Sequence, residues 1–426
     1  MSKIKLFPHQ TEALKNTEGL VRCAYFMDMG LGKTYVGSEK AVSIGNKIIL
    51  IICQKSKVGD WVDHFRTNYP DISVMDMTTP RAVENWFDRN GVMLGDEIQV
   101  MVINYELAWR RPDLLHLANF TLMLDESSLI QNRTAKQSKF VLKLKPSAVV
   151  LLSGTPVGGK YENLWTQVHL MGWKISEDLY NRQYVNWETI EAGGFTHKIV
   201  SKIQPYKNVE RLKSKMREHG AVFMKTEEVV DLPEQTFIKV KVDPIEEYWK
   251  FRKKGITLID EEELVGDTTL TKLLYSRQIC GHYNDNKLEA FRDLIQSTNE
   301  RLIVFYNFNK ELVTLLEIAR KVGKEVGFVN GSGRSMYAYE ECENSVTFIQ
   351  YRAGSKGLNL QKANKIIYFT LPLSSEDFEQ SKKRIHRIGQ KKTCFYYLMI
   401  TKGSVEEQIL HTLEERKDFT DELFKD

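Results

Sequence analysis

The sequence predicts an α/β protein with two doubly wound lobes, each built on a parallel sheet with helices on both faces. The chain has 426 residues, about three times the typical size of a domain. Short apolar runs, typical of buried parallel strands, alternate with stretches of helical spacing. This alternation runs from Arg22 to Leu152 and returns after about Val240. Two separate sheets are therefore expected.

The first lobe, placed at residues 1–172, is expected to consist of successive βα units. Helical spacing after two of its apolar runs predicts helices over Lys33–Ile44 and Lys57–Asn68. The apolar runs themselves are predicted to be the strands Arg22–Met27, Lys47–Cys53, Val100–Asn104, Thr121–Asp125 and Ala148–Leu152.

The second lobe, placed at residues 240–426, repeats this rhythm. Its tail has Ser404 and Glu407 in capping-box spacing, followed by apolar positions at helical intervals. We expect a C-terminal amphipathic helix that packs against this lobe. The predicted strands are Leu302–Tyr306, Glu325–Val329, Val346–Gln350, Lys365–Phe369 and Phe395–Ile400.

The segment between the lobes, residues 173–239, is predicted to be a helical insertion and linker. Strand signals are missing from Gly172 to Pro233. From His197 to His219 the segment has seven Lys and Arg against two Glu. Its basic character makes it a candidate for contacts with phosphates.

The composition excludes several classes of protein. Hydrophobic residues make up 42% and charged residues 27%, which fits neither a disordered chain nor a fibrous repeat. The five cysteines include no CxxC pair, which argues against a disulfide framework or structural zinc and favours a reducing interior. The net charge of +4 does not by itself identify a nucleic-acid binder. With no leader signal and no long apolar run, we expect no membrane partner.

A glycine-rich segment follows the first predicted strand and opens the first predicted helix. Its glycines would let backbone amides approach phosphate oxygens, its lysine would bind the β- and γ-phosphates, and its threonine would hold magnesium. Met27 stands where the usual motif has its first glycine, so a glycine-rich turn without a nucleotide stays open. The candidate residues are Met29, Gly30, Leu31, Gly32, Lys33 and Thr34.

Two carboxylates, Asp125 and Glu126, follow another predicted strand. The carboxyl ends of such strands are where α/β sheets bind ligands. Asp125 would hold magnesium, and Glu126 would position and polarise the attacking water in nucleotide hydrolysis. A solvated strand end is the alternative for an isolated pair, but the GKT segment makes it a poor one. The segment SGTP, which ends at Pro156, has small and hydroxyl residues suited to sensing a neighbouring phosphate.

The second lobe contributes a basic segment, QSKKRIHRIGQ. Arg384 and Arg387 have i, i+3 spacing in it, so on a helix they would share one face and both reach a triphosphate. A solvated basic helix is the alternative interpretation.

The order of these motifs is more informative than any one of them. Along the chain they are FPHQ, DMGLGKT, CQKSKVGDW, VINYE, LDESS, SGTP, YRAGSKGLNL and QSKKRIHRIGQ. This order resembles the motor of helicase superfamily two, and within it the Swi/Snf family of double-stranded DNA translocases. Matching segments run from Phe7 to Ile409. The resemblance therefore implies a minimal motor, of a type associated with phages and bacteria as well as with chromatin remodelling.

The resemblance also implies a mechanism: two RecA-like lobes hold ATP at their interface and move along DNA as they open and close. Gln10 would read the adenine, Gly357 would help to bind the nucleotide, and Arg384 and Arg387 would act as arginine fingers. The residues that would contact DNA or couple it to hydrolysis are Lys55, Lys57, Ser153, Thr155, Arg352, Ser355 and Asn359.

Two departures from the family pattern stand out. Ser128 occupies the fourth position of motif two, where the family usually has a histidine that links the ATP site to motif three. The stretch before the arginine segment also lacks the usual WNP. The first departure puts coupling in doubt, and the second puts DNA tracking in doubt.

The expected activity is ATP hydrolysis with Mg2+, stimulated by duplex DNA, that remodels branched or protein-bound DNA. A DNA-bound protein such as a polymerase is an expected partner, and we expect the chain to be a monomer. The expected location is the cytoplasm or the nucleoid, or the cytoplasm of a host if the protein is viral. Three alternatives stay open: a strand-separating or branch-migration DNA helicase, an ATP-gated clamp on DNA or polymerase, and an RNA helicase. Basic stretches that can contact phosphates include Lys198–Arg217 and Trp249–Lys254.

Overall fold

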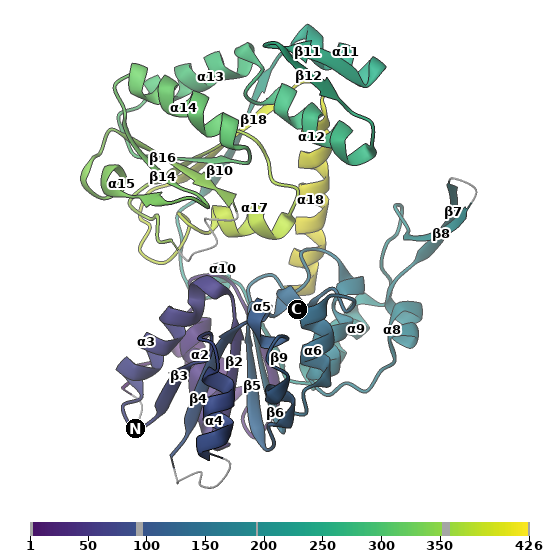
Figure 1. Ribbon diagram of the computed structural model, residues 1–426, viewed down its shortest axis with the longest axis vertical. Helices are drawn as coiled ribbons and strands as arrows, with labels where there is room; N and C mark the ends of the chain where they lie inside the picture. Colours follow the sequence, from purple (N-terminus) through teal and green to yellow (C-terminus); the bar gives the residue numbers. More distant parts are fainter. Residues whose placement is uncertain (1–2, 91–96, 193–194, 352–357, 425–426) are drawn as a thin grey trace. The chain divides into compact units, whose positions relative to one another are not determined.

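The structure, a computed structural model, describes residues 3–90, 97–192, 195–351 and 358–424. The chain divides into two compact units, residues 1–229 with 419–426 and residues 230–418. In its described residues each unit has one seven-stranded sheet (Figure 1). The predicted fold class, two parallel-sheet α/β lobes, is confirmed.

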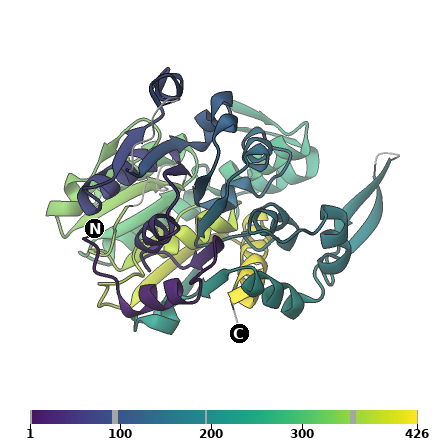
Figure 2. The ribbon, with the colours of Figure 1, turned by 90° about the horizontal axis from the view of Figure 1, so that it is seen from below.

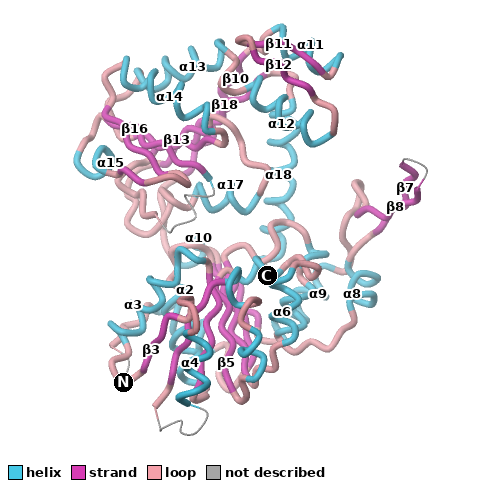
Figure 3. Tube along the Cα trace, in the orientation of Figure 1, coloured by secondary structure: helices cyan, strands magenta, loops and turns pink. Residues whose placement is uncertain are grey.

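The sheet of the first unit is parallel at every pairing between its described strands. Parallel neighbours require crossover connections, which helices provide. These helices include α2 (Lys33–Ser43), α3 (Val58–Asn68), α4 (Ala82–Asn90) and α6 (Lys136–Lys143) (Figure 3). Helix α1 (Pro8–Lys15) precedes the first strand. The strand order is β3 (Ser73–Asp76), β4 (Gln99–Asn104), β2 (Ile48–Cys53), β5 (Phe120–Asp125), β6 (Ala148–Ser153), β1 (Arg22–Met27) and β9 (Ala221–Met224).

Strand β2 shows why the sequence forms this sheet. All six residues of IILIIC are buried. Because successive side chains of a strand point to opposite faces, Ile48, Leu50 and Ile52 enter one apolar core. Ile49, Ile51 and Cys53 enter a second core on the other face. Both faces are covered, so the strand is a continuous apolar run rather than an alternating one.

The sheet of the second unit is also parallel, except for the antiparallel pairing of its last two strands. Helices α13 (Asp285–Gln296), α14 (Asn309–Lys321), α15 (Tyr337–Glu341) and α17 (Ser375–Lys382) belong to this unit. The strand order is β10 (Gln235–Val242), β18 (Cys394–Thr401), β17 (Lys365–Tyr368), β13 (Leu302–Tyr306), β16 (Ser345–Gln350), β14 (Glu325–Val329) and β15 (Arg334–Ser335).

The predicted C-terminal helix is present as α18 (Val405–Phe424). Its first turns pack into the core of the second unit through Val405 and Ile409. Glu406 accepts a hydrogen bond from Lys287 of α13 at 2.6 Å, and both side chains are buried. None of the helices in the described ranges is both long and apolar enough to cross a membrane.

Every strand predicted for the two lobes is present, with each end within one residue of its predicted position. The segment between the lobes differs from the prediction. It contains helices α8 (Glu177–Tyr184) and α9 (Val209–Glu218), but also a two-stranded hairpin of β7 (Trp187–Ala192) and β8 (Phe195–Val200). Strand β9 then joins the sheet of the first unit.

The predicted helices of the insertion are present, but the expectation that this segment lacks strands is wrong. Its hairpin extends away from the body of the first unit (Figures 1 and 2), and the first four residues of β8 are exposed. A strand without a buried face lacks the apolar pattern that predicts strands. Residues 173–229 lie in the first unit, and β10 begins the second sheet ahead of the expected boundary at residue 240.

Candidate nucleotide-binding site

Three of the predicted motifs lie at one edge of the first sheet. Strands β1, β6 and β5 are neighbours in this order. Phe26 of β1 pairs with Ser153 of β6, and Leu152 of β6 pairs with Asp125 of β5. Since the strands are parallel, the glycine-rich loop, the SGTP loop and the two carboxylates follow the same carboxyl edge, where ligands bind in such sheets.

The glycine-rich loop turns sharply into α2. Gly30 has φ +92° and Gly32 has φ +76°, a left-handed conformation that glycine adopts without the steric cost other residues pay. A Cβ at Gly32 would also lie 2.2 Å from Nε2 of Gln10. Leu31 is fully buried in the core, so its side chain anchors the loop. Like the two glycines, Leu31 can therefore contact a ligand only through its backbone.

The Lys33 ammonium lies at the start of α2 and points back to the end of β1. It donates to the carbonyl oxygens of Met27 at 2.8 Å and Asp28 at 3.3 Å. A Cβ at Gly154 of the SGTP loop would lie 3.3 Å from this Nζ. The lysine therefore lies between the glycine-rich loop and the SGTP loop. Thr34 follows it in the first turn of α2.

Gln10 holds the glycine-rich loop to α1. Its Nε2 donates to the Leu31 carbonyl at 3.0 Å, and its Oε1 accepts from the Phe7 N–H at 2.9 Å. A side-chain amide has two donors and two acceptor positions, so one of each is still available for a base. His9, which the sequence analysis did not single out, forms a second contact with the Leu31 carbonyl at 3.1 Å.

The surroundings of Asp125 act on its carboxylate in two opposite directions. Burial raises its pKa, whereas the hydrogen bond from Trp61 and the positive charges of Lys33 and Lys57 act in the opposite direction. The Trp61 indole of α3 donates to Oδ2 at 2.9 Å. The Tyr105 hydroxyl donates to the Asp125 backbone carbonyl at 3.0 Å. Trp61 and Tyr105 were not predicted, although both lie in quoted motifs.

Glu126 follows with φ +50° and ψ +61°, a left-handed conformation that costs a residue with a Cβ roughly 1–2 kcal/mol. A 3-10 helix, η3 (Ser127–Ile130), begins directly after it. Such backbone outliers concentrate at functional sites, where the surrounding structure holds them. The turn places Glu126 beside Asp125 at the end of β5.

The SGTP loop supplies two hydroxyl groups. Ser153 is buried at the end of β6 and its Oγ accepts from the Thr155 N–H at 3.2 Å. The Thr155 hydroxyl is buried and has no hydrogen-bond partner among the described residues. An unsatisfied hydroxyl in such a place costs free energy. A ligand at this edge of the sheet would remove that cost.

Lys55 and Lys57 form the short helix η1 (Lys55–Lys57) after β2. Lys55 is exposed. Lys57 is only 26% exposed and pairs with Asp60 of α3 at 2.6 Å. Lys55 is thus the better placed of the two for contact with an external phosphate.

The arginine segment of the second unit is not helical. Helix α17 ends at Lys382, so the expectation that Arg384 and Arg387 share one helix face is wrong. The Gln390 side-chain amide donates to three backbone carbonyls at 2.9–3.2 Å. Gly389 has φ +98°. These two features hold the segment in turns.

Arg387 donates a hydrogen bond to Oδ1 of Asn359, which brings together two residues predicted from different motifs. Burial lowers the pKa of Arg387. Arg384 is 4% exposed. The other predicted residues of this region, Arg352, Ser355 and Gly357, lie outside the described residues.

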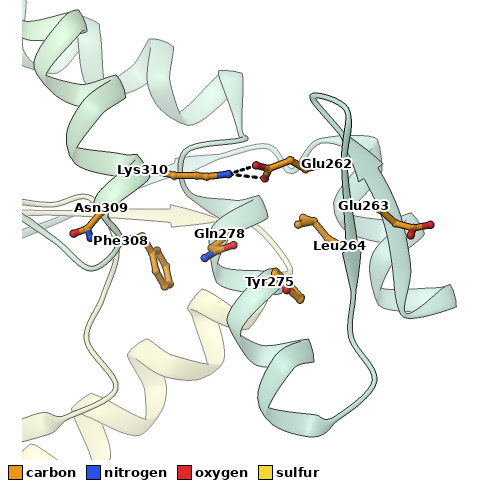
Figure 4. A pocket seen from close by; sticks show the side chains of 8 residues that line it. All are labelled: Glu262, Glu263, Leu264, Tyr275, Gln278, Phe308, Asn309 and Lys310. Carbon is orange, nitrogen blue, oxygen red and sulfur yellow. Dashed lines mark hydrogen bonds and ion pairs between the residues drawn. The ribbon is translucent and has the colours of Figure 1, made fainter.

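A pocket of about 440 Å3 in the second unit lies away from these motifs in the chain (Figure 4). It lies among β12 (Glu262–Val265), α12 (Thr269–Cys280) and the start of α14, and two of its lining residues, Lys310 and Glu262, form an ion pair. None of its lining residues belongs to a predicted site, so the pocket does not change the assignment.

The family model described as SNF2-related domain matches residues 17–285, and the model described as helicase conserved C-terminal domain matches residues 286–389. The chain belongs to the SNF2-related family. The resemblance inferred from the motif order is thereby confirmed.

Two curated proteins of this family match most of the chain. The putative ATP-dependent helicase/translocase YwqA of Bacillus subtilis is 26% identical over 446 residues, which cover 93% of this chain and 46% of YwqA. The mouse SWI/SNF-related matrix-associated actin-dependent regulator of chromatin subfamily A member 1 is 25% identical, over 91% of this chain and 40% of that protein. The chain spans less than half the length of these relatives.

A solved structure, the Sulfolobus solfataricus SWI2/SNF2 ATPase core in complex with dsDNA, covers 99% of this SNF2-related chain and 93% of that chain, with 19% identity and a TM-score of 0.46.

Proposed function

We propose that this SNF2-related chain is a DNA-stimulated ATPase that moves along duplex DNA and remodels branched or protein-bound DNA. The observation that carries the proposal is that three motifs follow the carboxyl ends of three neighbouring strands, β1, β6 and β5. A nucleotide on the glycine-rich loop would meet carboxylates and hydroxyls there. The name of one curated relative, the putative ATP-dependent helicase/translocase YwqA, supports ATP as that nucleotide.

The residues at this edge fit ATP with Mg2+. Backbone N–H groups at the start of α2 and the Lys33 ammonium suit the phosphates. The Thr34 hydroxyl and the Asp125 carboxylate are oxygen ligands of the kind that Mg2+ prefers. Trp61 takes one of the four or so lone-pair positions of that carboxylate. When bound, the metal would neutralise charge that develops on the phosphates.

Each remaining motif residue has a proposed role. Glu126 orients the attacking water and accepts its proton, and Gln10 reads the adenine with its second donor and acceptor. Arg384 and Arg387 stabilise negative charge in the transition state, and Gly357 contributes to nucleotide binding. The family membership supports these roles, and variants of each residue test them.

Double-stranded or branched DNA is the proposed partner, with a DNA-bound protein such as a polymerase as the object that is displaced. Exposed Lys55, together with Arg352 and Ser355, would contact phosphates, and such contacts provide affinity without sequence preference. Ser153, Thr155 and Asn359 would transmit the state of the nucleotide to the DNA. A monomer is the proposed functional unit.

Steady-state ATP hydrolysis tests this proposal, measured without nucleic acid and with single-stranded DNA, duplex DNA, forked DNA or RNA. Glu126→Gln serves as the blank. We expect strong stimulation by duplex DNA that the variant abolishes. Equal rates under every condition would overturn the motor proposal and favour an ATP-gated clamp.

Strand separation is a second candidate function, and the β7–β8 hairpin favours it. The hairpin extends from the first unit (Figure 1), and Phe195 at the start of β8 is 73% exposed. His197 and Lys198 follow on the same strand. An exposed aromatic ring with adjacent basic groups suits stacking on an unpaired base.

Displacement of a labelled strand from a fork, compared with triplex displacement on a duplex, separates the two candidates. If the hairpin separates strands, Phe195→Ala should lose fork unwinding and keep triplex displacement. The exposed Ile203→Ala, 94% exposed just beyond the hairpin, is the matched control. Equal fork activity in Phe195→Ala and the wild type would exclude this role.

A further inference from the structure

A buried chain of hydrogen bonds joins the carboxylate turn to the SGTP loop within the first unit. The Ser127 hydroxyl donates to Oε1 of Gln167 at 2.8 Å. Nε2 of the same Gln167 donates to the Pro156 carbonyl at 2.6 Å. Ser127 and Gln167 have no exposed surface. Ser127 directly follows Glu126, and Pro156 ends the SGTP loop.

The direction of this chain follows from the chemistry of its ends. The Pro156 carbonyl can only accept a hydrogen bond, so the amide nitrogen of Gln167 must face it. The amide oxygen then faces Ser127, whose hydroxyl donates its single proton. Gln167 thus uses both ends of its amide at once, and no other orientation satisfies both neighbours.

Gln167 is a polar residue in an otherwise apolar position. It lies on α7 (Trp165–Leu170), and its helix neighbours Val168 and Leu170 belong to the main core of the first unit. Burying an amide there without hydrogen-bond partners would cost several kcal/mol of folding free energy, whereas a leucine has no polar group that needs a partner. A glutamine in this place therefore needs a reason beyond packing.

Helix α7 is also fixed to the carboxylate turn by a second bond. The Thr166 hydroxyl donates to the Ile130 carbonyl at the end of η3, at 2.9 Å. The helix that presents Gln167 is thus bonded to η3, while the Gln167 amide reaches across to the SGTP loop. The far side of that loop meets Lys33, since a Cβ at Gly154 would lie 3.3 Å from its Nζ.

We propose that Gln167 is a positioning residue that couples Glu126 to the SGTP loop. The Ser127–Gln167–Pro156 chain connects the turn that carries Glu126 with the end of that loop. This inference rests on the proposed ATPase function, since it assigns the coupling of that site.

The test uses the full chain and variants that change the link with little change in volume. Gln167→Leu removes both bonds, Ser127→Ala removes the first, and the double variant combines them. Gln137→Leu is the matched control, because its Nε2 donates to the Leu129 carbonyl of η3 at 2.8 Å from a different helix. Thermal unfolding verifies that each variant is folded before its activity is compared.

We expect Gln167→Leu to lower the DNA-stimulated kcat about tenfold, with KM for ATP changed less than threefold. The amount of triplex displaced per ATP hydrolysed should fall as well. Ser127→Ala should show a smaller loss, and the double variant should match Gln167→Leu, because both residues serve one chain. Gln137→Leu should keep wild-type kcat and coupling.

A folded Gln167→Leu with wild-type kcat and coupling would overturn the inference while the proposed function stands. So would an equal loss in Gln137→Leu, or fully additive losses in the double variant. A wild type without DNA-stimulated hydrolysis would overturn the proposed function first, and the inference with it.

Discussion

The two units carry the same kind of sheet, yet they hold their motif residues in different ways. In the first unit the motifs follow neighbouring strand ends and are bonded to each other, as Trp61 is to Asp125 and Gln10 to the Leu31 carbonyl. In the second unit the arginine segment follows a helix, and Arg387 is bonded to Asn359 within irregular turns.

This difference separates two tasks. The interconnected edge of the first unit fixes the positions of groups that bind phosphate and polarise water, and such fixed positions favour catalysis. Side chains on turns can be moved more easily than side chains at strand ends. We therefore expect the first unit to hold the groups that carry out hydrolysis in fixed positions. We expect the second unit to supply positive charge whose position changes with the state of the nucleotide.

The largest expected effect tests the second half of this comparison. Arg387→Ala should lower kcat for ATP by about 10³–10⁵, the usual loss for an arginine finger, with a small change in KM. Arg387→Lys should remain impaired because a lysine lacks the planar guanidinium. Arg320→Ala, an exposed position on α14, is the control. Stopped-flow or coupled-enzyme assays with duplex DNA measure kcat for each variant. A loss below tenfold in Arg387→Ala would contradict its assignment as an arginine finger.

Removal of the proposed general base tests the first half. Glu126→Gln should lower kcat by about 10²–10⁴, the range for a lost acid–base group. Nucleotide binding should persist, since the amide keeps the shape of the side chain. Glu84→Gln, exposed on α4, should behave as wild type. Filter binding of labelled ATP alongside the hydrolysis assay distinguishes this from a binding defect, which would argue against the role.

The sequence predicts the first unit's edge better than the second unit's turns, for a physical reason. Fully buried strands such as β2 leave a continuous apolar run in the sequence, and their ends mark the ligand edge. In the turns after α17, the Gln390 amide contacts the carbonyl of Ala363, which lies far away in the sequence, so no local pattern shows this contact. Gln167 likewise gives no local signal, since only the fold brings it to Ser127 and Pro156.

The second unit also contains a buried carboxylate, Glu311, which has no proposed catalytic role. It therefore differs from the carboxylates Asp125 and Glu126 of the first unit. Its Oε2 accepts from the N–H groups of Asn307 and Phe308 at 2.9 and 3.1 Å. Burial raises the pKa of Glu311 to about 7. The folded state therefore holds a proton between about pH 4.5 and 7 that the unfolded state releases.

Stability from this group should accordingly be present below about pH 4.5 and be lost as the pH rises to about 7. Relative to Glu311→Gln, the wild type should lose about 3 kcal/mol of unfolding free energy over this interval, because one pKa unit corresponds to about 1.4 kcal/mol. Urea unfolding of both proteins at pH 5 and pH 8, followed by circular dichroism, measures the difference. An equal difference at both pH values would disprove the buried titration.

The smallest expected effect concerns the hydrogen bond between Trp61 and Asp125, which joins two motifs of the first unit. Trp61→Phe removes the indole N–H that donates to Asp125 but keeps an aromatic ring in the same buried position. Loss of a hydrogen bond to a charged group is worth about 1.5 kcal/mol, so kcat/KM for ATP should fall about tenfold. Trp86→Phe is matched, since its indole donates to Gln99 at 2.8 Å on β4. If both variants lose activity equally, the loss reflects general packing; if only Trp61→Phe does, the edge is held by its own internal bonds.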